Sequence, residues 1–217
     1  MIATWPAPTG KPELALVFDR GRKARLLVLP ALFDDANKLR HFTVELLRLL
    51  DQGGVDCLLP DLPGCNESTQ ALEDQTVVQW QAAALAAARH FGATHVLAIR
   101  GGALLAPPLP GWRYAPVTGE SLLRALLRAR VLASKEAGLA ETRDHLLAHG
   151  RQAGLELAGY RLGPAMIAGL EAAQPAELVD IAQGQLGGAG LWLRAEPDHN
   201  PEQVAALAAL VLADLDA

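Results

Sequence analysis

The sequence is poor in cysteine, and its two cysteines, Cys57 and Cys65, are too few for a disulfide framework or a cysteine-ligated zinc cluster. They favour a reducing compartment. Positive charge is also scarce, because 19 Lys and Arg stand against 24 Asp and Glu, for a net charge of −5. Nucleic-acid binding requires a basic face. The composition therefore excludes a general nucleic-acid partner and leaves only local basic patches.

Long apolar runs are absent as well. The longest aliphatic segment, residues 204–215, carries Asp214 and is too short to span a bilayer. The first 13 residues contain Pro6, Pro8 and Pro12 and lack the charged and then apolar order of a secretion signal. We therefore expect a cytoplasmic protein without a membrane partner.

What the sequence does contain is enough apolar material for one core. Its 217 residues are 51% hydrophobic and 20% charged, which is typical of a single globular domain, residues 1–217. Strand and helix patterns alternate in the order that forms a mostly parallel α/β sheet flanked by helices. Strands are predicted over 13–18, 23–29, 55–61, 94–99, 155–160, 177–181 and 191–193, and helices between 34 and 53 and over 77–90, 121–135, 141–149, 164–173 and 201–215. The first two strands, joined by a glycine-containing turn, are predicted to pair as the antiparallel beginning of the sheet.

The sharpest local pattern is the apolar run 94–99, which ends at Arg100 and two glycines. A buried parallel strand has this composition, and a sharp turn into a helix needs small residues where the backbone crowds. In the α/β-hydrolase nucleophile elbow, G-x-S-x-G, the middle residue lies on such a turn and attacks the substrate. In the corresponding frame, residues 98–102, Arg100 replaces the serine, and a guanidinium has no lone pair to offer an acyl carbon. The pattern predicts a hydrolase scaffold without a hydrolase nucleophile. Several prolines after residue 106 also predict that the following helix is very short.

Five segments occur in a characteristic order: 33–38, 60–65, the Arg100 elbow, 116–119 before a leucine- and arginine-rich helix, and 155–162. Together they resemble the second type of the exosortase A system-associated hydrolases, with similarity from Glu13 to the C-terminus. The resemblance implies an α/β-hydrolase fold, a gene setting beside exopolysaccharide production and protein sorting machinery, and arginine in the elbow as a family feature. It implies no substrate. The chain departs from the family by being shorter after the elbow and between 174 and 191, where a hydrolase places its triad acid, and residues 118–174 are predicted to form a reduced cap.

Arg100 and Gly101 are predicted to bind a small anionic ligand. An elbow lies at a helix N-terminus, where free N–H groups already favour an anion, and a guanidinium fork suits carboxylate or phosphate. The alternative is that Arg100 pairs permanently with an internal carboxylate such as Asp61 or Glu196 and only fills the pocket, because a buried arginine needs a partner in either case.

Three further residues are candidates for residual catalysis. His199 lies in the loop before the last helix, where the hydrolase histidine falls in chain order, although a plain loop histidine beside a helix start explains it as well. Cys65 and Ser68 lie in the loop after strand 55–61 and could be displaced nucleophiles, but a nucleophile needs a base within reach and the sequence shows none. A turn cysteine and a structural serine are the alternative.

No metal or cofactor is predicted, because Asp34, Asp35 and Asp61 have no accompanying His or Cys at ligand spacing. The basic helix 121–135 is interpreted as the solvated face of a lid, with an acidic partner or a membrane surface as alternatives. The expected function is therefore a catalytically degenerate hydrolase that binds a small anionic ligand or a protein partner. The alternative is an active esterase or thioesterase that uses Cys65 or Ser68 with His199 as base.

Overall fold

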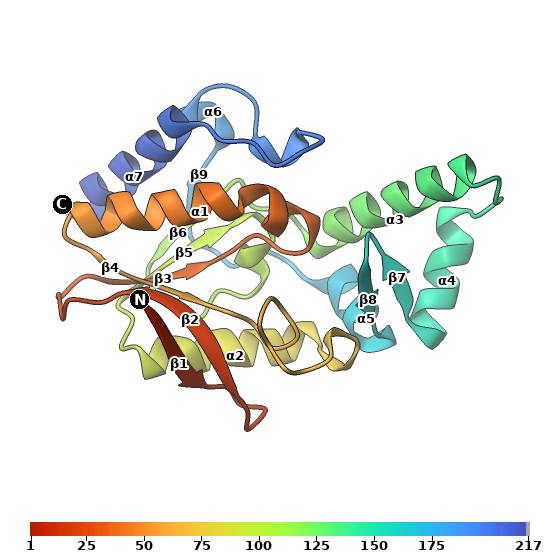
Figure 1. The fold of residues 1–217 in the computed structure, drawn as a ribbon, viewed down its shortest axis with the longest axis horizontal. Helices are drawn as coiled ribbons and strands as arrows, with labels where there is room; N and C mark the ends of the chain where they lie inside the picture. Colours follow the sequence, from red (N-terminus) through yellow and green to blue (C-terminus); the bar gives the residue numbers. More distant parts are fainter. Residues whose placement is uncertain (216–217) are drawn as a thin grey trace.

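A computed structural model describes residues 1–215 and consists of one central sheet with helices on both faces (Figure 1). The sheet has seven strands in the order β1-β2-β4-β3-β5-β6-β9. Strands β3, β4, β5, β6 and β9 run parallel, and β1 and β2 are antiparallel at one edge. The strands are β1 (Ile2–Pro6), β2 (Pro12–Phe18), β3 (Arg25–Leu29), β4 (Asp56–Pro60), β5 (His95–Ile99), β6 (Gly111–Tyr114) and β9 (Val179–Ile181).

The two faces of the sheet bury alternate residues of each strand. Leu27 and Leu29 of β3 face the core that contains helix α2 (Val77–His90), whereas Leu26 and Val28 face the core of helices α1 (Asp34–Gln52) and α7 (Pro201–Leu215). All four leucine and valine side chains are fully buried. Figure 1 shows α1 and α7 on one side of the sheet and α2 on the other. The near-continuous apolar composition of these strands follows from burial on both faces.

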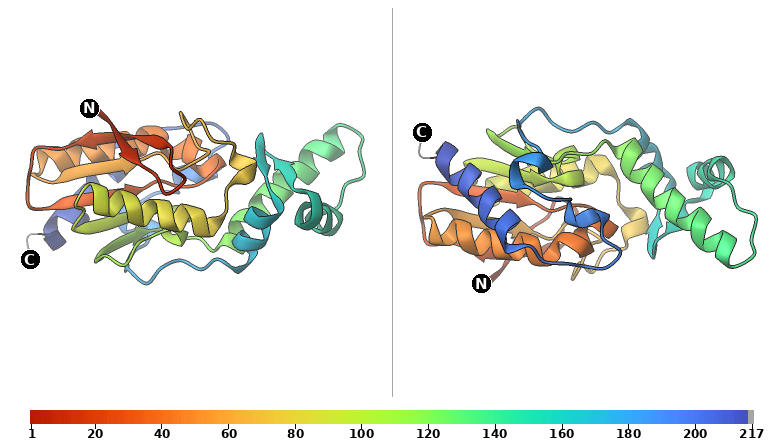
Figure 2. Two further views of the ribbon diagram at one scale, coloured as in Figure 1. Left: turned by 90° about the horizontal axis from the view of Figure 1, so that it is seen from below. Right: turned by 90° about the horizontal axis from the view of Figure 1, so that it is seen from above.

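Between β6 and β9 the chain forms a separate group of elements that extends away from the sheet (Figure 2). The group is anchored to the body, because Leu122, Leu126 and Leu170 join the same buried cluster as α2. Its elements are α3 (Gly119–Glu136), α4 (Arg143–Ala153), the hairpin of β7 (Leu155–Leu157) and β8 (Tyr160–Leu162), and α5 (Pro164–Ala172).

The structure confirms the predicted fold class and most of the predicted elements, and it corrects several details. Strands β2 and β3 do not pair with each other, because β4 lies between them. The antiparallel partner at the edge is β1, which the prediction omitted. Strand β6 and the short helix α6 (Gln183–Leu186) were also missed, and α4 is longer than the predicted 141–149.

Residues 191–193 form a short 3-10 helix, η3 (Leu191–Leu193), rather than the predicted strand. Three apolar residues carry too little periodicity to separate the two structures. Among the helices of residues 1–215, none combines the length and apolar character needed to cross a bilayer.

Candidate functional site

The elbow turn, residues 98–102, has the geometry that the two glycines predict. Arg100 follows β5 directly with φ 53°, and a short 3-10 helix, η2 (Arg100–Leu104), begins at the same residue. Gly102 is required by space, because a Cβ there would lie 2.5 Å from the carbonyl oxygen of Leu29 and 2.6 Å from that of Pro30. The turn is therefore a sharp strand-to-helix connection with a large side chain at its apex.

Three of the five non-glycine residues with positive φ among residues 1–215 follow neighbouring parallel strands at this edge of the sheet. Phe33 after β3, Arg100 after β5 and Ala115 after β6 are non-glycine residues with φ of 56°, 53° and 44°. Positive φ is costly for such residues and is most often retained at functional sites. The carboxyl ends of β3, β5 and β6 are adjacent in the sheet, so the three strained residues mark one place in the molecule.

The Arg100 guanidinium is held by three groups of the protein itself. Its Nε donates to Asp35 Oδ2 at 3.1 Å, and its Nη1 donates to the carbonyl oxygen of Ala115 at 2.9 Å. Its Cζ lies 4.0 Å from the centroid of the Trp192 ring, which is a cation–π contact. We call Arg100, Asp35, Ala115 and Trp192 the elbow cluster. An internal carboxylate therefore does pair with Arg100, but it is Asp35 rather than Asp61 or Glu196.

Charges in and around the elbow cluster balance. Lys38 bonds to Asp34 at 2.8 Å and donates to the carbonyl oxygen of Trp192 at 3.4 Å, so two cations stand beside two carboxylates. Burial raises the pKa of Asp35 above its ordinary value of 3.8, and the nearby Arg100 and Lys38 offset that only in part. The helix that follows the elbow is a 3-10 helix of five residues, which contributes little of the dipole expected of a long helix. The elbow is thus close to neutral.

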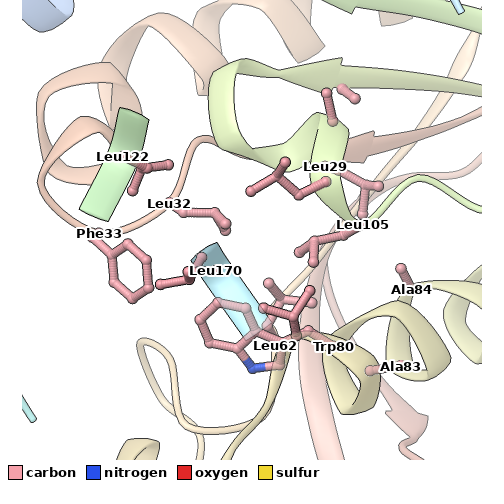
Figure 3. Close-up of a cluster of buried hydrophobic side chains, with 14 of the residues drawn as sticks. Leu29, Leu32, Phe33, Leu62, Trp80, Ala83, Ala84, Leu105, Leu122 and Leu170 are labelled. Carbon is pink, nitrogen blue, oxygen red and sulfur yellow. The ribbon is translucent and has the colours of Figure 1, made fainter. Parts of the chain in front are cut away.

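Apolar side chains pack against Gly101, the residue after Arg100. In α/β-hydrolases the N–H of the residue after the nucleophile and an N–H from the loop after β3 form the oxyanion hole. Here a Cβ on Gly101 would lie 2.6 Å from Leu122 Cδ1 and 3.1 Å from Leu32 Cγ, and both leucines are buried. Figure 3 shows Leu32, Phe33 and Leu122 converging from the loop after β3 and from α3. These side chains occupy the space beside Gly101.

Cys65 and Ser68 have contacts typical of a structural loop. The Ser68 hydroxyl donates to Glu13 Oε1 at 2.8 Å and accepts from the backbone N–H of Gly64 at 2.9 Å. Burial raises the pKa of the Cys65 thiol to about 12, so this thiol is protonated at neutral pH. Neither side chain has an imidazole as a hydrogen-bond partner within residues 1–215.

His199 lies on the surface near α1. Its ring stacks on that of His41, with centroids 4.1 Å apart, and both residues are exposed. The carboxylate of Glu45 lies 3.7 Å from His41 Nε2, and the backbone N–H of His199 donates to Asp198 Oδ1 at 2.8 Å. The hydrogen bonds of His199 in the described chain do not reach Cys65 or Ser68.

The three aspartates of the sequence motifs are engaged elsewhere. Asp35 bonds to Arg100, Asp34 bonds to Lys38, and Asp61 accepts from Asn66 at 2.5 Å. Among residues 1–215, no group of three or more His, Cys, Asp and Glu is arranged to hold a metal ion.

Two open hollows lie in or beside the elements that follow β6. One of about 400 Å³ is lined by Arg124, Arg128 and Val131 of α3 and by residues 142–144 at the start of α4. The other, of about 480 Å³, lies where the β7–β8 hairpin and the ends of α4 and α5 meet Glu73. Neither hollow includes a residue of the elbow cluster.

No protein-family model matches the chain, and no curated protein sequence matches it. Solved structures do. Est1E from Butyrivibrio proteoclasticus, solved with ferulic acid bound, is 14% identical, with 98% of each chain covered and a TM-score of 0.63. The chain has the α/β-hydrolase fold. The Bottromycin epimerase BotH, solved with Bottromycin A2, is 16% identical, with 99% of each chain covered and a TM-score of 0.57. A protein from Agrobacterium vitis S4 covers 98% of this chain and 97% of its own at 15% identity, with a TM-score of 0.50.

The sequence pattern did not identify the partners of Arg100. The signal for Asp35 was available, because it follows the strand that pairs with β5, and the carboxyl ends of neighbouring parallel strands meet at one edge. Trp192 and Ala115 were not predictable in the same way. Trp192 lies 92 positions further along, in a segment predicted as a strand, and Ala115 contributes only a backbone oxygen.

Proposed function

We propose that the protein is a non-hydrolytic relative of the α/β-hydrolases that acts by binding a partner. The observation that carries the proposal is the elbow cluster. At the position from which a hydrolase attacks its substrate stands Arg100, whose guanidinium is occupied by Asp35, Ala115 and Trp192. An arginine held in this way supplies neither a nucleophile nor a proton at neutral pH.

The surroundings of the elbow support the same proposal. Leu32 and Leu122 pack closely against the Cα of Gly101, so buried apolar side chains adjoin the elbow. An alternative nucleophile would need a base within hydrogen-bond reach. The Ser68 hydroxyl instead donates to Glu13, and the Cys65 thiol is protonated at neutral pH.

The comparisons leave room for a function other than hydrolysis. A fold does not fix a reaction. The neighbour BotH, which matches this chain over nearly its whole length, is named as an epimerase. The resemblance to the exosortase-associated hydrolases supports a role beside exopolysaccharide production. We further propose that residues 118–174 form a reduced cap and that the protein is cytoplasmic, which the two free cysteines favour.

A second candidate function keeps Arg100 as a ligand-binding residue. Its Nη2 has no hydrogen-bond acceptor within residues 1–215, and the side chain is 15% exposed. A small carboxylate or phosphate that displaced Asp35 would meet a guanidinium and the N–H of Gly101.

Ester turnover tests the first proposal. We expect wild-type protein to hydrolyse p-nitrophenyl acetate and short thioesters no faster than heat-denatured protein does. The variants Cys65→Ala, Ser68→Ala and His199→Ala should match wild type. Turnover that disappears in one of these variants would establish the esterase or thioesterase alternative.

Thermal unfolding separates the two binding roles of the elbow. Phosphate, acetate and citrate should change the melting temperature of wild type and of Arg100→Met by the same amount, because Arg100 is already paired. Stabilisation by one of these anions that is lost in Arg100→Met would favour the second candidate.

A further inference from the structure

The hairpin of α3 and α4, residues 119–153, differs in charge from the rest of the chain. It carries six Lys and Arg against four Asp and Glu, whereas the remaining residues carry 13 against 20. It also extends from the body on the side opposite the chain termini (Figures 1 and 2). A segment with a small net positive charge in an acidic protein is therefore presented at its far end.

The cations of α3 line the hollow between the two helices. Arg124, Arg128 and Val131 recur at helical spacing on α3, and Thr142, Arg143 and Asp144 face them from the start of α4. The opposite face of α3 is buried, with Leu122, Leu123, Leu126 and Leu127 in the core. The lining thus combines three guanidinium groups with one carboxylate and the apolar side chain of Val131.

Four of the six cations of the hairpin have a carboxylate partner, whereas Arg128 and Lys135 form no ion pair within residues 1–215. Arg130 is held by Glu141 at 2.8 Å, Arg124 bonds to Glu120, and Arg143 lies 3.5 Å from Asp144. Of the two cations without an ion pair in the described chain, Arg128 lines the hollow. A charged group that lines a hollow without a partner is available to a ligand.

Exposed apolar side chains continue the surface toward the tip of the hairpin. Leu132 is 59% exposed and Leu139 is 57% exposed. Leucine and arginine side chains that share a surface suit the binding of an amphipathic partner.

We propose that the α3–α4 hollow binds an acidic amphipathic segment of a partner protein. Carboxylates of that segment would meet Arg128 and Arg124, and an apolar side chain would enter the hollow over Val131. A peptide fits better than an anionic membrane, because the hollow is concave and four carboxylates share the hairpin with its cations. The proposal rests on the proposed function only in that a binding protein needs a binding surface.

Fluorescence anisotropy tests the proposal on the full chain. The probe is a fluorescein-labelled peptide of about 14 residues with Glu and Leu at helical spacing, and its control replaces every Glu with Gln. We expect saturable binding of the Glu peptide that weakens as salt rises, and no binding of the Gln peptide. Binding should fall at least about tenfold in Arg124→Glu/Arg128→Glu and in Arg143→Glu.

The matched control is Lys11→Glu/Lys23→Glu, which makes the same charge change in two exposed loops. This variant should bind like wild type, with unchanged circular dichroism showing that all variants fold. Equal binding of the Gln peptide, or equal loss in the control, overturns the proposal. So does self-association in light scattering that the Arg124→Glu/Arg128→Glu variant abolishes, or binding only to phosphatidylserine vesicles. Peptide binding together with ester turnover would contradict the proposed function and leave this surface standing.

Discussion

Two clusters of arginine and aspartate lie at opposite ends of the parallel strands, at the carboxyl edge and the amino edge of the sheet, and their contacts differ. At the carboxyl edge, the elbow cluster holds one ion pair, Arg100 with Asp35, closed by an indole ring and a backbone oxygen. At the amino edge, where β3 and β4 begin, Asp56 is fully buried and accepts from the backbone N–H groups of Arg20 and Arg22 and from the side chain of Arg25. We call residues Asp19, Arg20, Arg22, Arg25, Asp51 and Asp56 the amino-edge cluster.

The pKa directions record the difference. In the amino-edge cluster, hydrogen bonds from Arg20 and Arg22 lower the pKa of Asp51, and a hydrogen bond from Arg25 lowers that of Asp19. In the elbow cluster, burial outweighs Arg100 and raises the pKa of Asp35. Several hydrogen-bond donors stabilise the carboxylates of the amino-edge cluster, whereas burial destabilises the ionised form of Asp35 in the elbow cluster. Arg100 itself lies on a turn with positive φ. The charges of Arg100 and Lys38 offset only part of the cost of burying the Asp35 carboxylate.

Removal of the centre of the amino-edge cluster should cost the most. Asp56→Ala leaves Arg22 and Arg25 half-buried without their shared carboxylate and two backbone N–H groups unpaired. We expect a loss of about 3–5 kcal/mol in the free energy of unfolding, measured by urea denaturation. As a control, Asp198→Ala, in an exposed pair with Arg194, should change it by less than about 0.5 kcal/mol. A loss for Asp56→Ala as small as that for Asp198→Ala would show that the amino-edge cluster does not stabilise the fold.

Breaking the elbow pair should cost less. Arg100→Met leaves Asp35 partly buried without its cation, and we expect a loss of about 1–3 kcal/mol by the same measurement. Because Asp35 is then the uncompensated group, Arg100→Met/Asp35→Asn should recover part of that loss. A double variant as unstable as the sum of the two single variants would mean that the two residues do not interact.

The indole should contribute a smaller amount. Trp192→Ala removes the ring over Arg100 and should lower the free energy of unfolding by about 1 kcal/mol for the cation–π contact, plus the loss of its packing against Tyr114. In Arg100→Met the same substitution should cost less than in wild type. If Trp192→Ala lowers the free energy of unfolding equally in wild type and in Arg100→Met, the cation–π contact does not stabilise the protein.

The dependence of stability on pH should have opposite signs at the two edges. Asp35 binds protons more readily when folded, so its cost is present at neutral pH and is relieved as pH falls through its raised pKa toward 3.8. Asp51 binds them less readily when folded, so its contribution is lost only as pH falls below 3.8.

Urea midpoints of wild type, Asp35→Asn and Asp51→Asn between pH 7 and pH 3 measure this. As pH falls, the urea midpoint of wild type should rise relative to that of Asp35→Asn and fall relative to that of Asp51→Asn. Parallel curves for the three proteins would contradict the pKa directions.

The sequence contained enough to predict the scaffold, because long helices such as 77–90 have apolar residues at helical spacing and buried strands such as 95–99 are short apolar runs. It did not reveal the place of β4 between β2 and β3, since strand order depends on long-range pairing. The elbow turn followed from Arg100 and two glycines. The closure of that turn by Asp35, Ala115 and Trp192 did not, because those three residues come from segments that only the folded chain brings together.

Labelling with a fluorophosphonate tests most directly the claim that the protein has no activated serine nucleophile. Such a probe forms a covalent adduct with an activated serine, and intact-protein mass spectrometry detects the added mass. The account predicts no adduct in folded wild-type protein, under conditions in which a serine esterase is fully labelled. An adduct on Ser68 or on any other serine, lost when His199 is changed to Ala, would contradict it.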